Sequence, residues 1–176
     1  KNPKRPLVVV LGGAKVSGKI VAVEQLVRVA DQMIIGGALS NTFFKYRGWQ
    51  IGKSVFESDQ DLLIERIYAE ARRKVGNERV DEFIQLPTDV AVASSIDESH
   101  KRTIVNARKV QPGDYILDLG TNSTALLLAH IKTAATVVWC GTLGRAEDIV
   151  FAYSSAKLAT ALAAQKNHTL SVIGGG

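Results

Sequence analysis

Short runs of apolar residues alternate with longer amphipathic segments along most of the chain. The runs have the length of buried strands and fall at 7–11, 33–35, 83–86, 89–93, 115–119, 136–140 and 169–173. The spacing of apolar residues between them predicts helices over 19–30, 40–47, 59–75, 122–132 and 154–165. Strands made almost entirely of Val, Ile and Leu are typical of a parallel sheet that is buried on both faces. The pattern therefore predicts an α/β fold, a three-layer Rossmann-like arrangement with a mostly parallel sheet and helices on both faces.

Composition narrows the class of protein further. The 176 residues carry 22 basic and 17 acidic side chains, and the basic ones are scattered among the acids rather than gathered in one patch, which argues against a nucleic-acid surface. The densest basic group, at 72–74, closes a predicted helix, where cations complement the helix dipole. A single cysteine, Cys140, excludes an internal disulfide. Without an apolar run of about 18 residues or a secretion signal, we expect a cytoplasmic protein with no membrane partner.

Glycines follow several of the predicted strands. They form clusters at Gly12-Gly13, at Gly36-Gly37, at Gly120, at Gly141 with Gly144, and at Gly174-Gly175-Gly176. The carboxyl ends of parallel strands meet at one edge of a sheet, and ligands of such sheets bind beyond that edge. The clusters therefore predict a long ligand that the backbone contacts closely.

The segment 7–20, LVVVLGGAKVSGKI, carries the strongest chemical signal. It places a strand, then a loop rich in glycine and lysine, directly before a predicted helix. Backbone N–H groups and the positive end of a helix dipole form a site for phosphate there. Lys15 and Lys19 are four residues apart, so both can face the same phosphate oxygens. The segment predicts a nucleotide held by its phosphates.

Two general interpretations of this loop stay open on the residues alone. Residues 13–20 nearly match the P-loop pattern, but Ile20 has no hydroxyl for Mg²⁺ where that pattern needs Ser or Thr. A P-loop NTPase would hydrolyse ATP with this chain alone, whereas a nucleotide-binding protein without catalysis would bind ADP and never turn over.

The three histidines, His100, His130 and His168, have no partners at the spacing of a hydrolase triad or a zinc site.

A resemblance to a known family uses much more of the chain than the P-loop pattern does. Seven blocks arrive in one order: GGAKVSGKI at 12–20, IIGGALSNTFFK at 34–45, IGKSVFESD at 51–59, LPTDVAVA at 86–93, ILDLG at 116–120, VVWCGTLGRAE at 137–147 and VIGGG at 172–176. Together they resemble the C-terminal, nucleotide-binding domain of phosphoglycerate kinase, and the resemblance covers almost all 176 residues.

The resemblance implies a two-lobed, monomeric glycolytic enzyme. It would transfer a phosphoryl group between 1,3-bisphosphoglycerate and ADP, with Mg²⁺ as the cofactor of ADP and ATP. We expect residues 1–176 to form its nucleotide-binding domain, incomplete at the C-terminal end, and the N-terminal phosphoglycerate-binding domain to be absent. A fragment without the lobe that holds the acceptor is expected to be inactive alone, since positioning of the two substrates supplies much of the rate.

The resemblance also implies roles for individual residues. Lys15 and Lys19 match the lysines that reach the nucleotide phosphates and the transferred group, and Glu147 matches the acid that binds the ribose hydroxyls. The other expected nucleotide-binding residues are Gly12, Gly13, Ala14, Gly36, Gly37, Leu117, Gly141, Gly174, Gly175 and Gly176. The family's Mg²⁺-binding Asp would follow Gly176, so no metal ligand is expected within these residues.

Several positions depart from the family pattern. Gly18 replaces an Asp, and Cys140 and Thr142 replace the Asn and Pro of the VVWNGP block. Thr121 replaces a Pro, and Ala146 replaces the aromatic residue before the ribose-binding acid. None of these changes removes a lysine or Glu147, so we expect a working kinase whose nucleotide affinity and base selectivity differ from the family's.

Overall fold

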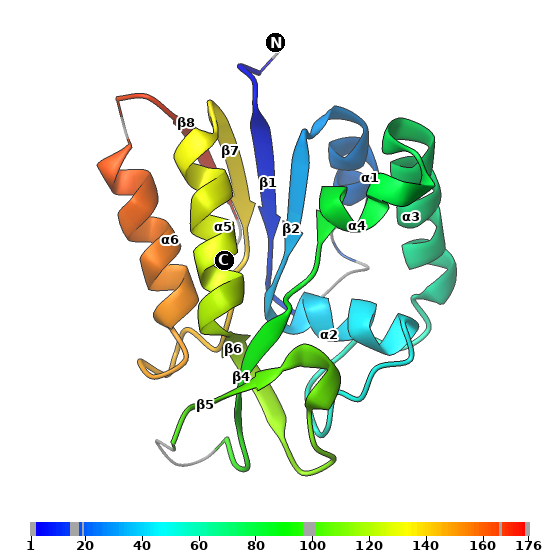
Figure 1. Cartoon of the computed structure of the whole chain (residues 1–176), viewed down its shortest axis with the longest axis vertical. Helices are drawn as coiled ribbons and strands as arrows, with labels where there is room; N and C mark the ends of the chain where they lie inside the picture. Colours follow the sequence, from blue (N-terminus) through cyan, green and yellow to red (C-terminus); the bar gives the residue numbers. More distant parts are fainter. Residues whose placement is uncertain (1–2, 15–17, 19, 97–100, 166, 175–176) are drawn as a thin grey trace.

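The centre of the fold is a five-stranded parallel sheet. We analysed a computed structural model, which describes residues 3–14, 18, 20–96, 101–165 and 167–174. The strands of this sheet are β1 (Leu7–Leu11), β2 (Gln32–Ile35), β3 (Ile84–Gln85), β7 (Thr136–Cys140) and β8 (Leu170–Gly174), in the spatial order β3-β2-β1-β7-β8 (Figure 1). All four neighbouring pairs run parallel. The prediction of a mostly parallel sheet is confirmed.

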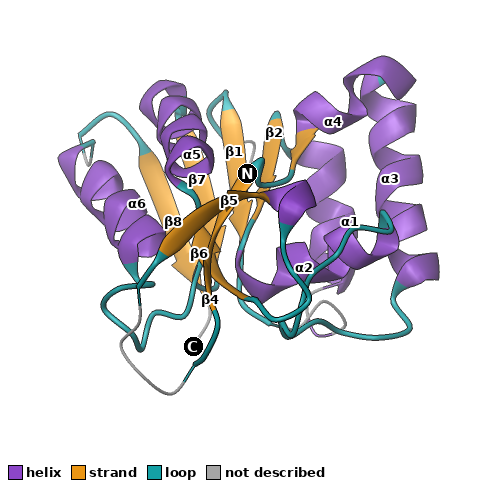
Figure 2. Cartoon of the chain, turned by 60° about the horizontal axis from the view of Figure 1, so that its bottom comes forward, coloured by secondary structure: helices purple, strands orange, loops and turns teal. Residues whose placement is uncertain are grey.

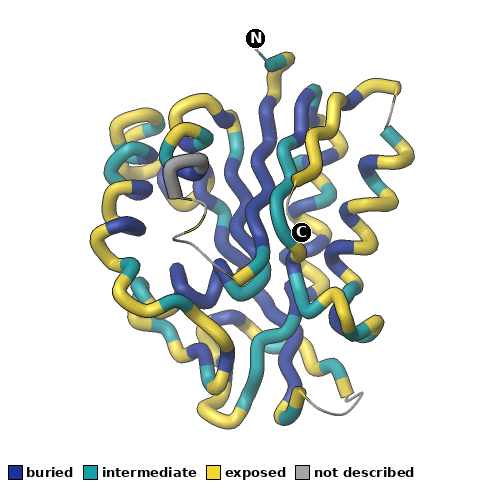
Figure 3. The backbone as a smooth tube through the Cα atoms, turned by 180° about the vertical axis from the view of Figure 1, so that it is seen from behind, coloured by how far each residue is buried: buried dark blue, intermediate teal, exposed yellow. Residues whose placement is uncertain are grey.

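Helices cover both faces of this sheet because the side chains of its central strand alternate between two cores. Leu7, Val9 and Leu11 of β1 pack in the core formed with α1 (Ile20–Val29), α2 (Gly37–Tyr46) and α3 (Asp61–Val75). Val8 and Val10 pack in a second core with α5 (Thr121–Thr133) and α6 (Tyr153–Ala164). The central strands are therefore buried on both sides (Figure 3), and the predicted three-layer arrangement is confirmed.

A second, smaller sheet was not expected. It is antiparallel, has the order β5-β4-β6 and consists of β4 (Asp89–Ala93), β5 (Thr103–Asn106) and β6 (Tyr115–Leu119). Figure 2 shows these strands in front of the lower ends of the parallel strands. Segments 89–93 and 115–119 are strands, as predicted, but they pair with each other and not with the main sheet. An apolar run predicts burial, and it does not specify the partner or the direction of pairing.

The other differences from the expected elements are local. The structure adds β5, a short helix α4 (Val80–Phe83) and two 3₁₀ turns, η2 (Asn77–Arg79) and η3 (Ala107–Lys109). Helix α2 begins three residues earlier than predicted, at Gly37. Most of β5 is exposed, so it carries no apolar signal. Within the described ranges, no helix has the length and hydropathy needed to cross a membrane.

Lys74 near the end of α3 joins that helix to α1. Its Nζ donates to the carbonyl oxygens of Val27 and Arg28, each at 3.0 Å, and also to that of Ala30. These carbonyls close the C-terminal end of α1, where intrahelical donors run out. Burial lowers the pKa of Lys74. The basic cluster at 72–74 therefore contains one residue with a specific structural role.

Replacing Lys74 with methionine is expected to lower the free energy of unfolding by about 2 kcal/mol, because three carbonyls lose a charged donor while the apolar contacts stay. Urea unfolding followed by circular dichroism measures the change. Arg73→Met is the matched control, since Arg73 is exposed and pairs only with Glu70 at 2.7 Å among the described residues. That control should cost less than about 0.5 kcal/mol. Equal losses in both variants would contradict the role of Lys74.

Candidate functional site

Three loops at the carboxyl ends of the parallel strands are tied together by backbone hydrogen bonds. In the order β3-β2-β1-β7-β8, the strands β2 and β3 lie on one side of β1. The strands β7 and β8, which come later in the chain, lie on its other side. The direction in which strands are added therefore reverses between β1 and β7, and these two strands flank the switch point. Gly12 N donates to Cys140 O at 2.8 Å, Gly13 N to Thr142 O at 2.7 Å and Gly37 N to Leu143 O at 3.0 Å. Ligands of open α/β sheets bind at this place.

A cavity of about 420 Å³ opens there, between the loops and the antiparallel sheet. This volume lies within the usual range of small-molecule sites. Its walls come from the loops after β1, β2 and β7, from the first turns of α2, from the 54–55 segment and from β6. The lining residues are Gly13, Ala14, Gly37, Ala38, Ser40, Asn41, Ser54, Val55, Ile96, Tyr115, Ile116, Leu117, Asp118, Leu119, Thr142, Leu143, Gly144, Arg145 and Glu147.

The cavity brings together a subset of the residues predicted from the sequence. Gly13, Ala14, Gly37, Leu117 and Glu147 come from four separate parts of the chain and all line it. Another four expected residues, Gly12, Gly36, Gly141 and Gly174, do not line it and lie in the strand ends and loops beside it. Lys15, Lys19, Gly175 and Gly176 lie outside the described residues, so the structure does not test their roles.

Two of the predicted glycines, Gly12 and Gly37, allow neighbouring loops to pack closely against each other. A Cβ on Gly12 would lie 2.1 Å from Thr142 O, and a Cβ on Gly37 would lie 2.6 Å from the same oxygen. Gly37 also has a φ of +60°. These glycines are required where the loops pack against each other. At these two positions the glycines allow the loops that form the cavity floor to approach each other, and the predicted approach to a ligand stays a prediction.

The expectation that all five glycine clusters meet at one sheet edge was wrong for Gly120. This residue follows β6, which belongs to the antiparallel sheet. A Cβ on Gly120 would lie 2.2 Å from the carboxyl carbon of Asp89. The glycine leaves room for that carboxylate and does not line the cavity.

Asp118 is a buried carboxylate that lines the cavity and is bound by backbone N–H groups of the protein itself. Its oxygens accept hydrogen bonds from Leu119 N at 2.8 Å and Ser154 N at 3.1 Å, and Arg102 lies 3.5 Å away. Burial raises the pKa of Asp118, and these donors oppose that rise. The carboxylate holds β6 against the start of α6. The sequence left open whether Asp118 is structural or touches a substrate, and its donors favour the structural role.

Asn41 is a buried polar residue of the cavity with one side-chain atom unpartnered among the described residues. Its Nδ2 donates to Val55 O at 2.9 Å, while no group in the described ranges donates to its Oδ1. A buried acceptor without a donor is costly, so it is a group that a bound ligand can satisfy. Sequence reasoning did not single out Asn41, although it lies inside the IIGGALSNTFFK block.

Other lining residues were also missed. Ser54 and Val55 lie in the IGKSVFESD block, which was identified as a whole without a role for its members. Ile96 and Tyr115 come from the ends of β4 and β6 and depend on the antiparallel sheet, which the sequence did not predict. Ser54 Oγ accepts a hydrogen bond from Ile116 N at 2.7 Å and so fixes one wall to β6.

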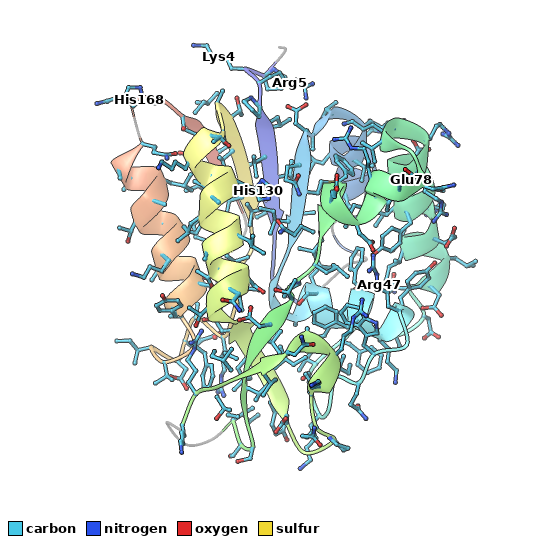
Figure 4. All side chains as sticks on the ribbon, in the orientation of Figure 1. Lys4, Arg5, Arg47, Glu78, His130 and His168 are labelled. Atoms are coloured by element: carbon cyan, nitrogen blue, oxygen red, sulfur yellow. The ribbon has the colours of Figure 1, made fainter. Side chains whose placement is uncertain are left out.

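Two departures from the family pattern contact the site through the backbone. Cys140 and Thr142 accept the hydrogen bonds of Gly12 and Gly13 with their carbonyl oxygens, which are present whatever the side chain is. Among the described residues, no group of three His, Cys, Asp or Glu side chains is placed to hold a metal ion. Neither His130 on α5 nor His168 beyond α6 lines the cavity (Figure 4), and His100 lies outside the described part of the chain.

Comparison with known proteins places this architecture in one family. The phosphoglycerate kinase family matches residues 1–176. A phosphoglycerate kinase of Coxiella burnetii (strain RSA 493 / Nine Mile phase I) is 37% identical over 176 residues, which make up 100% of this chain and 43% of that protein. The structure of phosphoglycerate kinase from Coxiella burnetii superposes with a TM-score of 0.89 at 37% identity, again over 100% of this chain and 43% of that one.

A more distant structure agrees. Phosphoglycerate kinase from Pyrococcus horikoshii OT3 has a TM-score of 0.74 and 26% identity over 98% of this chain and 42% of its own. The chain thus spans 43% of the length of the curated relative that it matches. With a match that runs over all 176 residues, the chain belongs to the phosphoglycerate kinase family.

Proposed function

We propose that these residues are the nucleotide-binding half of a phosphoglycerate kinase and that the cavity binds ADP and ATP. The observation that carries this proposal is the meeting of Gly13, Ala14, Gly37, Leu117 and Glu147 in one cavity at the β1/β7 switch point. These five residues were assigned to the nucleotide from four different sequence blocks, with Gly13 and Ala14 sharing one. The full-length protein would be a cytoplasmic, monomeric glycolytic enzyme.

The cavity is lined by both apolar and polar side chains. Leu117, Leu143 and Val55 offer an apolar surface suited to a base, and the Oδ1 of Asn41 offers a buried acceptor. Glu147 is exposed, and its carboxylate can accept hydrogen bonds from ribose hydroxyls. The base would then contact the apolar surface and the ribose Glu147, and the phosphates would lie against Gly13 and Ala14 in the loop after β1.

The loop after β1 would hold the phosphates. Lys15 and Lys19 would stabilise negative charge on the transferred group, and Mg²⁺ bound to the nucleotide supplies further charge neutralisation. Of the two carboxylates that line the cavity, Asp118 is engaged by backbone donors and Glu147 is proposed for the ribose. Neither is therefore proposed as a metal ligand.

Phosphoryl transfer leaves the protein mainly with positioning and charge stabilisation. The acceptor must be held in line with the nucleotide, and we assign that task to the part of the full-length protein outside these residues. A coupled assay of the full-length protein for ATP formation from ADP and 1,3-bisphosphoglycerate tests the proposal. Binding of ADP without any turnover would support the non-catalytic alternative, and absence of both would overturn the proposal altogether.

Glu147→Gln is expected to raise the KM for ADP about three- to tenfold with little change in kcat, because hydrogen bonds to a charged acceptor are stronger than those to an amide. Steady-state kinetics of the full-length enzyme measures this. Asp148→Asn is the matched control: it removes the same charge next door, and its amide oxygen can still accept from Val150 N, which Asp148 Oδ1 binds at 2.9 Å. An equal rise in KM for both variants would contradict the ribose contact.

A further inference from the structure

A second cavity, of about 400 Å³, lies apart from the nucleotide site and shares no lining residue with it. It is bounded by the end of α2, by α4 and β3, and by the turn η3 that follows β5. Its floor is apolar, since Ile84, Leu86 and Ala107 are buried there. Its rim carries two arginines, Arg47 and Arg108.

Trp49 holds both guanidinium groups in place. One contact of its indole ring is a stacked arrangement with the buried Phe44, at 5.1 Å between centroids and 23° between planes. The guanidinium carbon of Arg108 lies 4.6 Å from the centroid of the indole, and that of Arg47 lies 5.9 Å from it. Cations are held over aromatic faces by the ring quadrupole. The two arginines are therefore ordered before any ligand arrives.

The two arginines differ in how they are paired. Arg47 donates to Tyr68 Oη at 3.0 Å and forms an ion pair with Asp81. Arg108 forms no ion pair with any residue in the described ranges. Asp81 is the single acid among the described residues that line the cavity, so these side chains give the rim a net positive charge.

Neutral donors add to the arginines at the same rim. Asn106 Oδ1 accepts a hydrogen bond from Arg108 N at 2.9 Å, which leaves the two N–H groups of its amide as donors. Guanidinium and amide donors around one space match the oxygens of a carboxylate or a phosphate.

We propose that this cavity is a second binding site for a small anion with an apolar body, in which a carboxylate or phosphate group contacts Arg108 and Asn106 while an aromatic or aliphatic group fills the apolar floor. Figure 4 labels Arg47 at the end of α2, beneath α4, at one side of this space. The site does not depend on the proposed function, since it shares no residue with the nucleotide cavity.

Fluorine NMR of the full-length protein labelled with 5-fluorotryptophan tests the site directly. The Trp49 signal is assigned by its loss in Trp49→Phe, and Trp139, which lines neither cavity, is the internal reference. Benzoate and phenyl phosphate are the anionic probes, benzyl alcohol is the uncharged probe, and inorganic phosphate is the anion without an apolar body. We expect at least one anionic probe to shift the Trp49 signal saturably, with at least about tenfold higher affinity than benzyl alcohol or inorganic phosphate.

Arg108→Gln is expected to weaken binding of that probe about tenfold or more, because it removes a charged donor. Lys109→Gln is the matched control: it removes the same charge from the next residue of the same turn, and Lys109 does not line the cavity. Circular dichroism checks that both exposed substitutions keep the fold. Absence of a saturable shift with either anionic probe, equal affinity for benzyl alcohol, or equal weakening by Lys109→Gln would each overturn the proposal.

Discussion

Replacing Gly12 with alanine is expected to lower the free energy of unfolding by about 3–5 kcal/mol and to weaken ADP binding more than tenfold. The new Cβ would lie 2.1 Å from Thr142 O, 2.7 Å from Thr142 C and 2.8 Å from Gly141 O, all of them backbone atoms. Backbone cannot rotate away as a side chain can. The loops after β1 and β7 would have to separate.

Separation of these loops would break the contacts that form the cavity floor. Gly12 N donates to Cys140 O at 2.8 Å and Gly13 N to Thr142 O at 2.7 Å, and both Gly13 and Thr142 line the cavity. The stability loss and the loss of affinity therefore have one cause. Urea unfolding and calorimetric titration with ADP, both on the full-length protein, measure the two effects.

Gly18→Ala is the matched control for Gly12→Ala. A Cβ on Gly18 would meet no atom of the described part of the chain within 4 Å, and its φ lies outside the left-handed region. Alanine there should change stability by less than about 1 kcal/mol, with a gain expected from reduced freedom of the unfolded chain. If Gly12→Ala were as stable as Gly18→Ala, the close packing of the β1 and β7 loops would be wrong.

The main sheet could be predicted because its signal is local. Each residue of β1 is buried, and an unbroken apolar run of five residues in a chain that alternates such runs with helices indicates a parallel strand. Strand β4 is buried just as completely, yet it pairs antiparallel with β5 and β6. The burial of a strand can be predicted from its own residues, whereas the strand with which it pairs and the direction of pairing depend on the path of the whole chain. Most of strand β5 is exposed, so even its burial could not be used to predict it.

The site residues that could be predicted from the sequence are those in sequence blocks that follow the ends of strands. Gly13, Gly37 and Glu147 line the cavity because they lie in the segments that follow β1, β2 and β7. Asn41 and Ser54 needed the structure, since their importance comes from an unsatisfied oxygen and from a hydrogen bond to β6. The sequence also could not distinguish a glycine that admits a ligand from one that admits another loop. Only distances between backbone atoms make that distinction.

Replacing Asp89 with alanine is expected to lower the free energy of unfolding by about 3 kcal/mol, because its carboxylate caps a helix from a distant part of the chain. Oδ1 accepts hydrogen bonds from Ser123 N at 2.7 Å and Ser123 Oγ at 2.6 Å, and Oδ2 accepts one from Asn122 N at 3.0 Å. Both N–H groups lie in the first turn of α5, whose own N-cap residue, Gly120, has no side chain to serve them.

The negative charge adds to the effect, since it lies at the positive end of the dipole of α5. Asp89→Asn separates charge from hydrogen bonding: its one remaining oxygen can serve Ser123, but its amide N–H₂ then faces the donor of Asn122. That variant should lose about half as much stability as Asp89→Ala. Guanidinium unfolding of the full-length protein, with all variants measured at one pH, gives the comparison.

Asp114→Ala provides the matched control for the loss of a capping carboxylate. Asp114 Oδ2 accepts one hydrogen bond, from Gln111 N at 2.9 Å in an exposed turn, so its removal should cost less than about 1 kcal/mol. The contrast follows from burial, because water can serve the donor of the exposed turn, whereas the N–H of Ser123 at the start of α5 is buried. A loss as small for Asp89→Ala as for Asp114→Ala would contradict the capping role of the Asp89 carboxylate.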